Sequence, residues 1–258
     1  MNSWQDKLIR AKQHSRELEV VIKSFFDSQP YKISTKRNPQ TRQLIYFVTS
    51  ANDLPKEIPL ITGDIIQNLK SALDHLAYQL FTTETKGKIA GTHIYFPIAK
   101  DLQTYESVKN KKTVGIAQPA KDLIDALKPY KGGNDILWRI NELNNTDKHR
   151  LLITVGSSFG SLDIGAHMGV LMKKLGPGFD IPMPSLFLKP ADILFPLKAG
   201  DELFIDGPDA QEIPNMQFKF NIVLNEPGIV GGEPLIDVLT QMESEIDKLI
   251  PIFDPLFQ

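Results

Sequence analysis

The segment GDIIQNLKSALDHLAYQL, residues 63–80, most constrains the fold, because its apolar residues recur at helical spacing. Drawn at about 100° per residue, they fill an arc of roughly 140°; they are Ala72, Ile65, Leu76, Leu69, Leu80, Leu73, Ile66 and Ala77. Such a stripe predicts a helix over residues 58–82 that buries one face against other elements. On the opposite side, Asp64, Asn68 and His75 fall within about 40° of one another.

The same reasoning divides the rest of the chain into helices and strands. Apolar spacing and capping residues predict further helices over residues 3–27, 119–129, 133–149 and 234–256. A hairpin is expected over 31–50, a short strand or extended segment at 93–98, and strands at 151–155, 192–197, 202–205 and 216–225. The predicted class is α+β: a helical bundle with an antiparallel β-rich insertion and a C-terminal helix that returns to the bundle.

Composition and charge support a division near residue 150. Residues 1–150 hold 23 Lys and Arg against 16 Asp and Glu, whereas residues 151–258 hold 6 against 15. The sequence therefore predicts a mainly helical part over 1–150 that includes the early hairpin, a β-rich part over 151–230, and a C-terminal helix over 231–258 that packs on the helical part. The positive part is the one suited to attract anions.

Cysteine content and hydropathy indicate the cellular compartment in which the chain is expected. The chain has no cysteine, which excludes disulfides and cysteine nucleophiles and favours a reducing compartment. The first residues lack the uninterrupted apolar core of a signal peptide, and no run approaches about 18 apolar residues. We therefore expect a cytoplasmic protein with no membrane association.

The polar face of the 58–82 helix lacks the Glu and Lys that ordinarily solubilise such a surface, which predicts that a second element covers it. The expected cover is NELNNTDKHRLL, residues 141–152, which concentrates donors, acceptors and cations. Two explanations stay open. The basic residues complement a helix C-terminus, or they share a site with the polar face. Lys70 and Asp74, four residues apart, are expected to form an ordinary helix-surface ion pair.

Two motifs carry a resemblance. GDIIQNLKSALDHL and NNTDKHRLL together resemble an uncharacterised family of bacterial proteins with the pattern G-D-x-x-x-N-L-R/K-S-A-L-D-H-L followed by N-x-D-K-H-R. More distantly, the chain is similar to HEPN domains, helical bundles that include metal-independent ribonucleases and carry an Arg, four to six residues, then His. Lys70 and His75 have that spacing, with Lys in place of Arg, and an ammonium does not reproduce the bidentate grip of a guanidinium on phosphate.

Other motifs are weak. GSSFG, residues 156–160, matches G-x-S-x-G, but the one later histidine is His167 and no helix is expected after the serine. Neither a P-loop nor G-x-G-x-x-G occurs, so no nucleotide cofactor is expected. We also expect no bound metal. The alternative would be an oxygen and nitrogen site that combines Asp64, Asp74, His75, Asp147 and His149.

Two classes of function remain. The first is cleavage of RNA or another phosphodiester, with His75, His149 and Asp74 as candidate catalytic residues and with Tyr78 and Trp138 available to stack on bases. The candidate binding residues are Asp64, Asn68, Lys70, Asn145, Asp147, Lys148 and Arg150. Candidate partners are RNA, another phosphate-bearing ligand, or a second copy of the chain. The second class is a non-catalytic binding or interaction protein, in which the polar residues satisfy one another and leave no open pocket.

Overall fold

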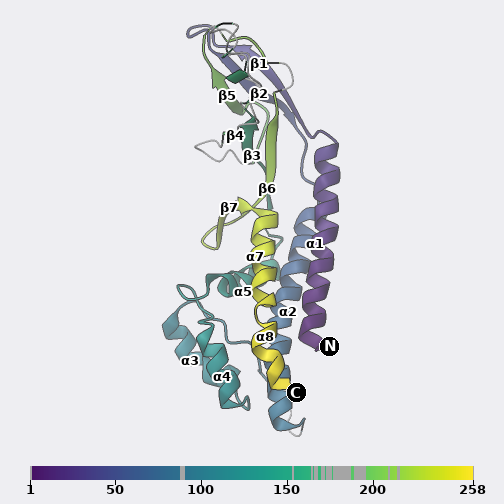
Figure 1. The fold of residues 1–258 in the computed structure, drawn as a ribbon, viewed down its shortest axis with the longest axis vertical. Coiled ribbons are helices and arrows are strands. Elements are labelled where there is room, and N and C mark those ends of the chain that lie inside the picture. Colours follow the sequence, from purple (N-terminus) through teal and green to yellow (C-terminus); the bar gives the residue numbers. More distant parts are fainter. Residues whose placement is uncertain are drawn as a thin grey trace. The chain divides into compact units, whose positions relative to one another are not determined.

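A computed structural model describes residues 2–87, 91–152, 154–163, 187–188, 196–208, 210–213 and 216–257, with isolated positions at 165, 168–169, 172 and 176 (Figure 1). The chain forms two compact units. Unit 1 comprises Met1–Val21, Lys56–Ile153 and Leu224–Gln258, and unit 2 comprises Ile22–Pro55 and Thr154–Val223.

Unit 1 is mainly helical. Its elements are most of α1 (Ser3–Asp27), then α2 (Glu57–Thr85), α3 (Leu102–Lys112), α4 (Gln118–Ala126), α5 (Asp135–Asp147), β7 (Val230–Pro234), α7 (Leu235–Asp247), α8 (Ile250–Phe253) and the 3-10 helix η2 (Asp254–Phe257). None of the helices in the described part of the chain is both long enough and apolar enough to span a membrane.

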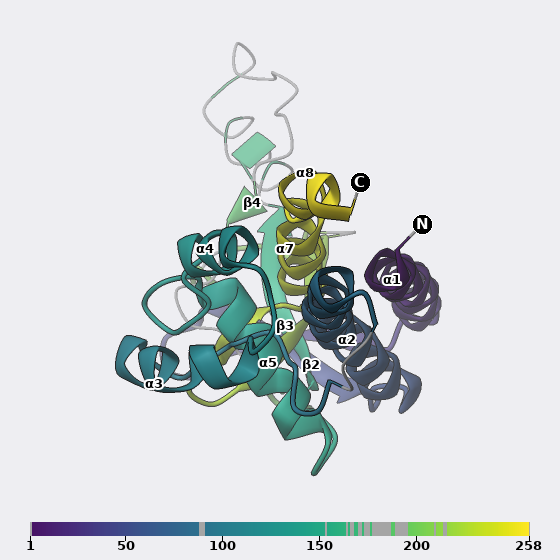
Figure 2. The ribbon, with the colours of Figure 1, turned by 90° about the horizontal axis from the view of Figure 1, so that it is seen from below.

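The apolar stripe of α2 forms the centre of unit 1. All the residues of the predicted stripe are buried, and α2 packs against α5 and α7. The N-terminal part of α1 lies beside α2, and α7 lies on another side of α2 (Figure 2). Polar contacts tie α1 to the C-terminal helices: Lys12 pairs with Asp247 at 2.5 Å, and Gln5 Nε2 donates to Asp254 Oδ1 at 2.9 Å. The predicted packing of the four long helices is therefore confirmed.

Unit 2 contains the strands. Strands β1 (Tyr31–Arg37), β2 (Leu44–Ala51) and β5 (Glu202–Asp206) form one antiparallel sheet in the order β1-β2-β5. The second sheet has the order β4-β3-β6-β7 and is built from β3 (Thr154–Asp163), β4 (Phe187–Leu188) and β6 (Phe218–Glu226), with β7 of unit 1 paired to the end of β6. Val48, Leu197 and Leu203 form a buried hydrophobic cluster in unit 2.

The predicted α+β class is confirmed, but several boundaries differ. The strand expected at 151–155 begins at Thr154 and runs to Asp163, straight through GSSFG, so the serine motif has no strand-to-helix turn. Residues 93–98 form neither a helix nor a strand, and part of the strand expected at 192–197 lies outside the described residues, as does His167. The helix expected over 234–256 is divided into α7, α8 and η2.

The early hairpin belongs to unit 2, with the later strands, although the sequence had grouped it with the helical part. Three elements were not predicted: the two-residue strand β4, α3, whose one buried residue is Tyr105, and β7, whose sequence is VGGEP.

Candidate functional site

Asp64 and Asp147, from the two predicted motifs, lie close together where α2 and α5 cross. A Cβ added to Gly63 would lie 2.6 Å from Asp147 Oδ1, so only glycine lets the carboxylate pack on the backbone of α2. Burial raises the pKa of Asp147, and the nearby charge of Asp64 raises it further. The second motif therefore reaches the polar face at its N-terminal end, but it does not cover that face as predicted, because Asp64 is exposed.

Asn144 is the most buried of the predicted polar residues. Its side chain is 1% exposed, and neither Nδ2 nor Oδ1 has a hydrogen-bond partner in the described part of the chain. A non-catalytic protein was expected to satisfy every buried polar group internally. Asn144 departs from that expectation, because its amide has no partner. An unpaired buried amide lowers the stability of the fold by about 1–3 kcal/mol. Its burial also separates it from any ligand.

Lys70 and Asp74 form the predicted pair, but inside the protein. Lys70 is 8% exposed, and its Nζ lies 2.6 Å from both oxygens of Asp74. Asp74 Oδ1 also accepts from the backbone N–H of Phe96 at 3.2 Å. Lys112 donates to the carbonyl of Ile98 at 3.1 Å, and its pKa is lowered, first by burial and then by the charge of Lys70. These residues hold the segment before α3 against α2.

His75 contacts a different element. Its Nδ1 lies 3.2 Å from Ser3 Oγ at the start of α1. Asp64 and His75 share an angular sector, but eleven residues separate them, which is about 16 Å along a helix axis. Asn68 lies between them and donates to the carbonyl of Asp64 at 2.8 Å. The structure thus brings Asp64 and Asp147 together, whereas the hydrogen bond of His75 is to α1.

Lys70 and His75, the pair that resembles the HEPN motif, point to different sides of α2. Five residues correspond to about 500°, or 140° after a full turn. Accordingly Lys70 bonds to Asp74, and His75 bonds to Ser3 of α1. The two side chains do not converge on one phosphate position within this chain.

The end of the second motif is exposed, apart from one ion pair. Asn145, Lys148 and His149 are exposed. Arg150 donates to both carboxylate oxygens of Glu226, at 3.1 and 2.7 Å, and the side chain of Glu226 is 2% exposed. The guanidinium predicted to bind a ligand therefore neutralises a buried carboxylate at the end of β6.

The two residues predicted to stack on bases differ in their exposure to solvent. Tyr78 is 46% exposed, whereas Trp138 is 7% exposed and lies under the Nζ of Lys131, 4.4 Å from the ring centroid. Among the residues that the structure describes, no group of three or more His, Cys, Asp or Glu has the geometry of a metal site.

A small polar cavity of about 130 Å³ lies between α3 and α4. The buried hydroxyl of Tyr105 donates to Asp125, and Lys109 Nζ lies 2.9 Å from the same carboxylate. Burial, followed by the hydrogen bond to Asp125, raises the pKa of Tyr105. These groups satisfy one another, so this cavity offers few open positions to a ligand.

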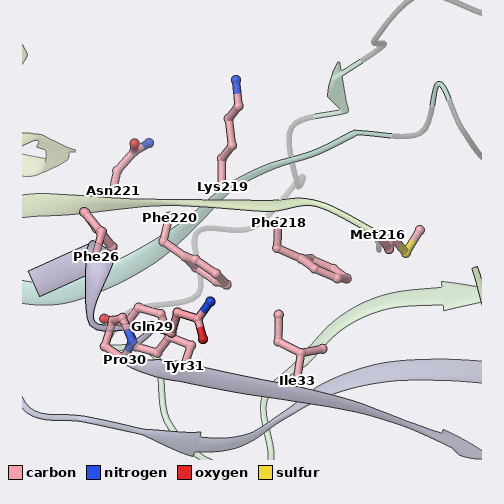
Figure 3. A pocket seen from close by; sticks show the side chains of 10 residues that line it. All are labelled: Phe26, Gln29, Pro30, Tyr31, Ile33, Met216, Phe218, Lys219, Phe220 and Asn221. Carbon is pink, nitrogen blue, oxygen red and sulfur yellow. The ribbon is translucent and has the colours of Figure 1, made fainter. Parts of the chain in front are cut away.

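A larger cavity, which the sequence did not indicate, lies within unit 2. Its volume is about 660 Å³ (Figure 3). The described residues that line it are mostly aromatic or aliphatic: Phe26, Gln29, Pro30, Tyr31, Ile33, Met216, Phe218, Lys219, Phe220 and Asn221. A smaller hollow of about 170 Å³ shares Ile33, Met216 and Phe218 with it.

Strand alternation makes this cavity apolar. Phe218 and Phe220 of β6 point toward Tyr31 and Ile33 of β1, and Lys219 points away (Figure 3). The rings of Tyr31 and Phe220 are tilted by 48°, with centroids 4.7 Å apart. The alternation of residues 216–224 predicted the strand, but not that its apolar face would border open space.

Gln29 forms the turn at one end of the cavity. It follows the end of α1 with φ of 52°, and its N–H donates to the carbonyl of Phe26 at 2.9 Å. This position after a helix is usually glycine or asparagine, since another residue there costs about 1 kcal/mol. Gln29 before Pro30, directly after the amphipathic helix α1, is the sequence feature that could have indicated this turn.

Comparison of the chain with family models, curated proteins and solved structures gives no significant match. The resemblances to the bacterial family and to HEPN domains stay predictions.

Replacing Asn144 by Leu is expected to stabilise the protein by about 1–3 kcal/mol, because an apolar side chain of similar shape removes an unpaired buried amide. The matched control is Asn145→Leu, one residue away and exposed, for which we expect a change within about 0.5 kcal/mol. Urea unfolding measures both. Destabilisation by Asn144→Leu would mean that the amide has a partner that the leucine cannot replace.

Asp147→Asn is expected to raise the melting temperature at neutral pH, because it removes a charge that burial and Asp64 both disfavour. The raised pKa means that the folded protein binds this proton more readily than the unfolded chain. Stability from this group is therefore present at low pH and lost as pH rises through the raised pKa. The gain should vanish as pH falls below the ordinary Asp value of about 3.9. Thermal melts over a pH series test this, and a lower melting temperature at neutral pH would contradict it.

Proposed function

We propose that the protein is a non-catalytic binding protein that takes up a small, mainly apolar molecule in the cavity of unit 2. The observation that carries the proposal is the cavity itself, an open hollow of about 660 Å³ bordered largely by aromatic and aliphatic side chains. Ligand sites in proteins typically have about 300–1,000 Å³, apolar walls and a few polar groups. On this reading the Lys70–Asp74 and Arg150–Glu226 ion pairs belong to the packing of unit 1 and not to a ligand site.

The walls favour a ligand with flat apolar surfaces. Phe26, Tyr31, Phe218 and Phe220 offer ring faces and edges, and Met216 adds a side chain that adapts to irregular shapes. No carboxylate occurs among the described residues that line the cavity, so no side chain in this set forms an ion pair with a cationic ligand.

Filling the cavity tests the proposal. N-phenyl-1-naphthylamine, a neutral dye that fluoresces in apolar surroundings, is expected to bind the wild-type protein, and Met216→Trp is expected to weaken binding about tenfold or more by occupying the same space. The control is Ile205→Trp, an exposed position on β5 that does not line the cavity. Fluorescence titration measures both. Equal affinity in all three proteins would exclude this cavity as the binding site.

A second candidate is the phosphodiester cleavage predicted from the sequence. Exposed His149 and Lys148, at the end of α5, support it, since a general acid or base and a cation accessible to RNA are what such a reaction needs. His75, partly exposed, is a further candidate base, whereas Lys70, Asp74 and Arg150 are held in ion pairs.

RNA cleavage separates the two candidates. If the second holds, the wild-type protein should cleave a labelled single-stranded RNA without added metal, and His149→Ala should reduce the rate by about 10²–10⁴-fold. His14→Ala provides a control histidine on α1, paired with Glu17. A rate that is equal in the wild type, His149→Ala and His75→Ala would assign any cleavage to a contaminant and remove this candidate.

A further inference from the structure

The polar side chains around the cavity of unit 2 differ in direction. Lys219 and Asn221 alternate with the phenylalanines of β6 and point away from the cavity, whereas the amide of Gln29 points toward the space beside β1 (Figure 3). In the described part of the chain, neither Nε2 nor Oε1 of Gln29 hydrogen-bonds to another protein group. The Gln29 amide thus brings one donor group and one acceptor to a largely apolar cavity.

The backbone of Gln29 is an independent observation. Its φ of 52° lies in the left-handed region, where glycine or asparagine would be less strained. Positive φ alone means little, since Arg42, Lys86, His93 and Lys128 share it, but none of these four lines the cavity. At Gln29, which is exposed, an unfavourable backbone position coincides with an amide at the edge of the cavity that no protein group occupies, and such strain is often retained at binding sites.

The chemistry of the walls and of the amide defines a ligand class. Aromatic side chains favour a planar apolar body. A carboxamide pairs best with a group that presents an N–H and a C=O side by side, through two parallel hydrogen bonds. Resting on the proposed binding function, we propose that Gln29 selects planar ligands that carry a lactam or a primary amide at one edge.

Two probes that differ by one methyl group test this. The bicyclic lactam 2-quinolinone has the paired N–H and C=O, and 1-methyl-2-quinolinone has the same ring system without the N–H. Wild-type protein is expected to bind the lactam about five- to tenfold more tightly than the N-methyl compound, as one lost hydrogen bond predicts. Isothermal titration calorimetry measures both affinities.

The variants separate recognition from stability. Gln29→Gly should remove the preference for the lactam while raising the melting temperature, because glycine relieves the left-handed backbone. Lys86→Gly is the matched control: it relieves the same strain at the end of α2, where φ is also 52°, and should raise the melting temperature with the preference intact.

The outcomes distinguish this inference from the proposed function. If the naphthylamine dye binds in the cavity but the two quinolinones bind equally or not at all, the role of Gln29 is overturned and the binding function stands. A lactam preference that survives Gln29→Gly overturns the role of Gln29 in the same way. If neither the dye nor the quinolinones bind, both fail.

Discussion

The burial of α2 against α5 and α7 is the contact on which unit 1 depends. Helix α2 has 29 residues, and its Leu, Ile and Ala side chains form the centre of the unit. Each fully buried Leu or Ile contributes about 1.5–3 kcal/mol relative to an exposed one. This packing sets how closely α5 approaches, and at Gly63 the approach is so close that Asp147 occupies the space of a side chain. Apolar packing therefore sets the geometry of the α2–α5 crossing, and the polar residues do not.

The elements with a strong local pattern could be predicted from the sequence, and those held by partners could not. The apolar spacing in α1, α2 and α5 and the alternation in β6 reflect one buried face, which is a property of the segment itself. Helix α3 buries only Tyr105, so it has no stripe, although Asp101 caps it by accepting from the N–H of Thr104. Strand β7 contains two glycines and a proline and exists because β6 pairs with it.

The candidate polar site was less predictable, because a helical projection shows the angle of a residue around the helix axis but not its position along that axis. Asp64 and His75 appear adjacent in projection, yet they meet different elements: Asp147 lies at the first, and Ser3 bonds to the second. The partners of the ion pairs could not be predicted from the sequence either. Nothing near Arg150 in the sequence indicates that Glu226, 76 residues later, needs its guanidinium. The residue pattern of one helix face predicted contact with a second element, but not which residues along the helix make that contact.

The ligand binding proposed for the cavity of unit 2 is linked to stability, because the residues that line the cavity also pack against the core. Tyr31, Ile33, Met216, Phe218 and Phe220 line the cavity and pack against the cluster of Val48, Leu197 and Leu203. A side chain that borders open space loses dispersion contacts on that side. A molecule that fills the space restores those contacts and stabilises the folded unit by RT ln(1 + [L]/Kd), about 2.7 kcal/mol at a hundredfold excess over Kd. Under the proposed function, the stability of unit 2 therefore depends on whether this cavity is occupied.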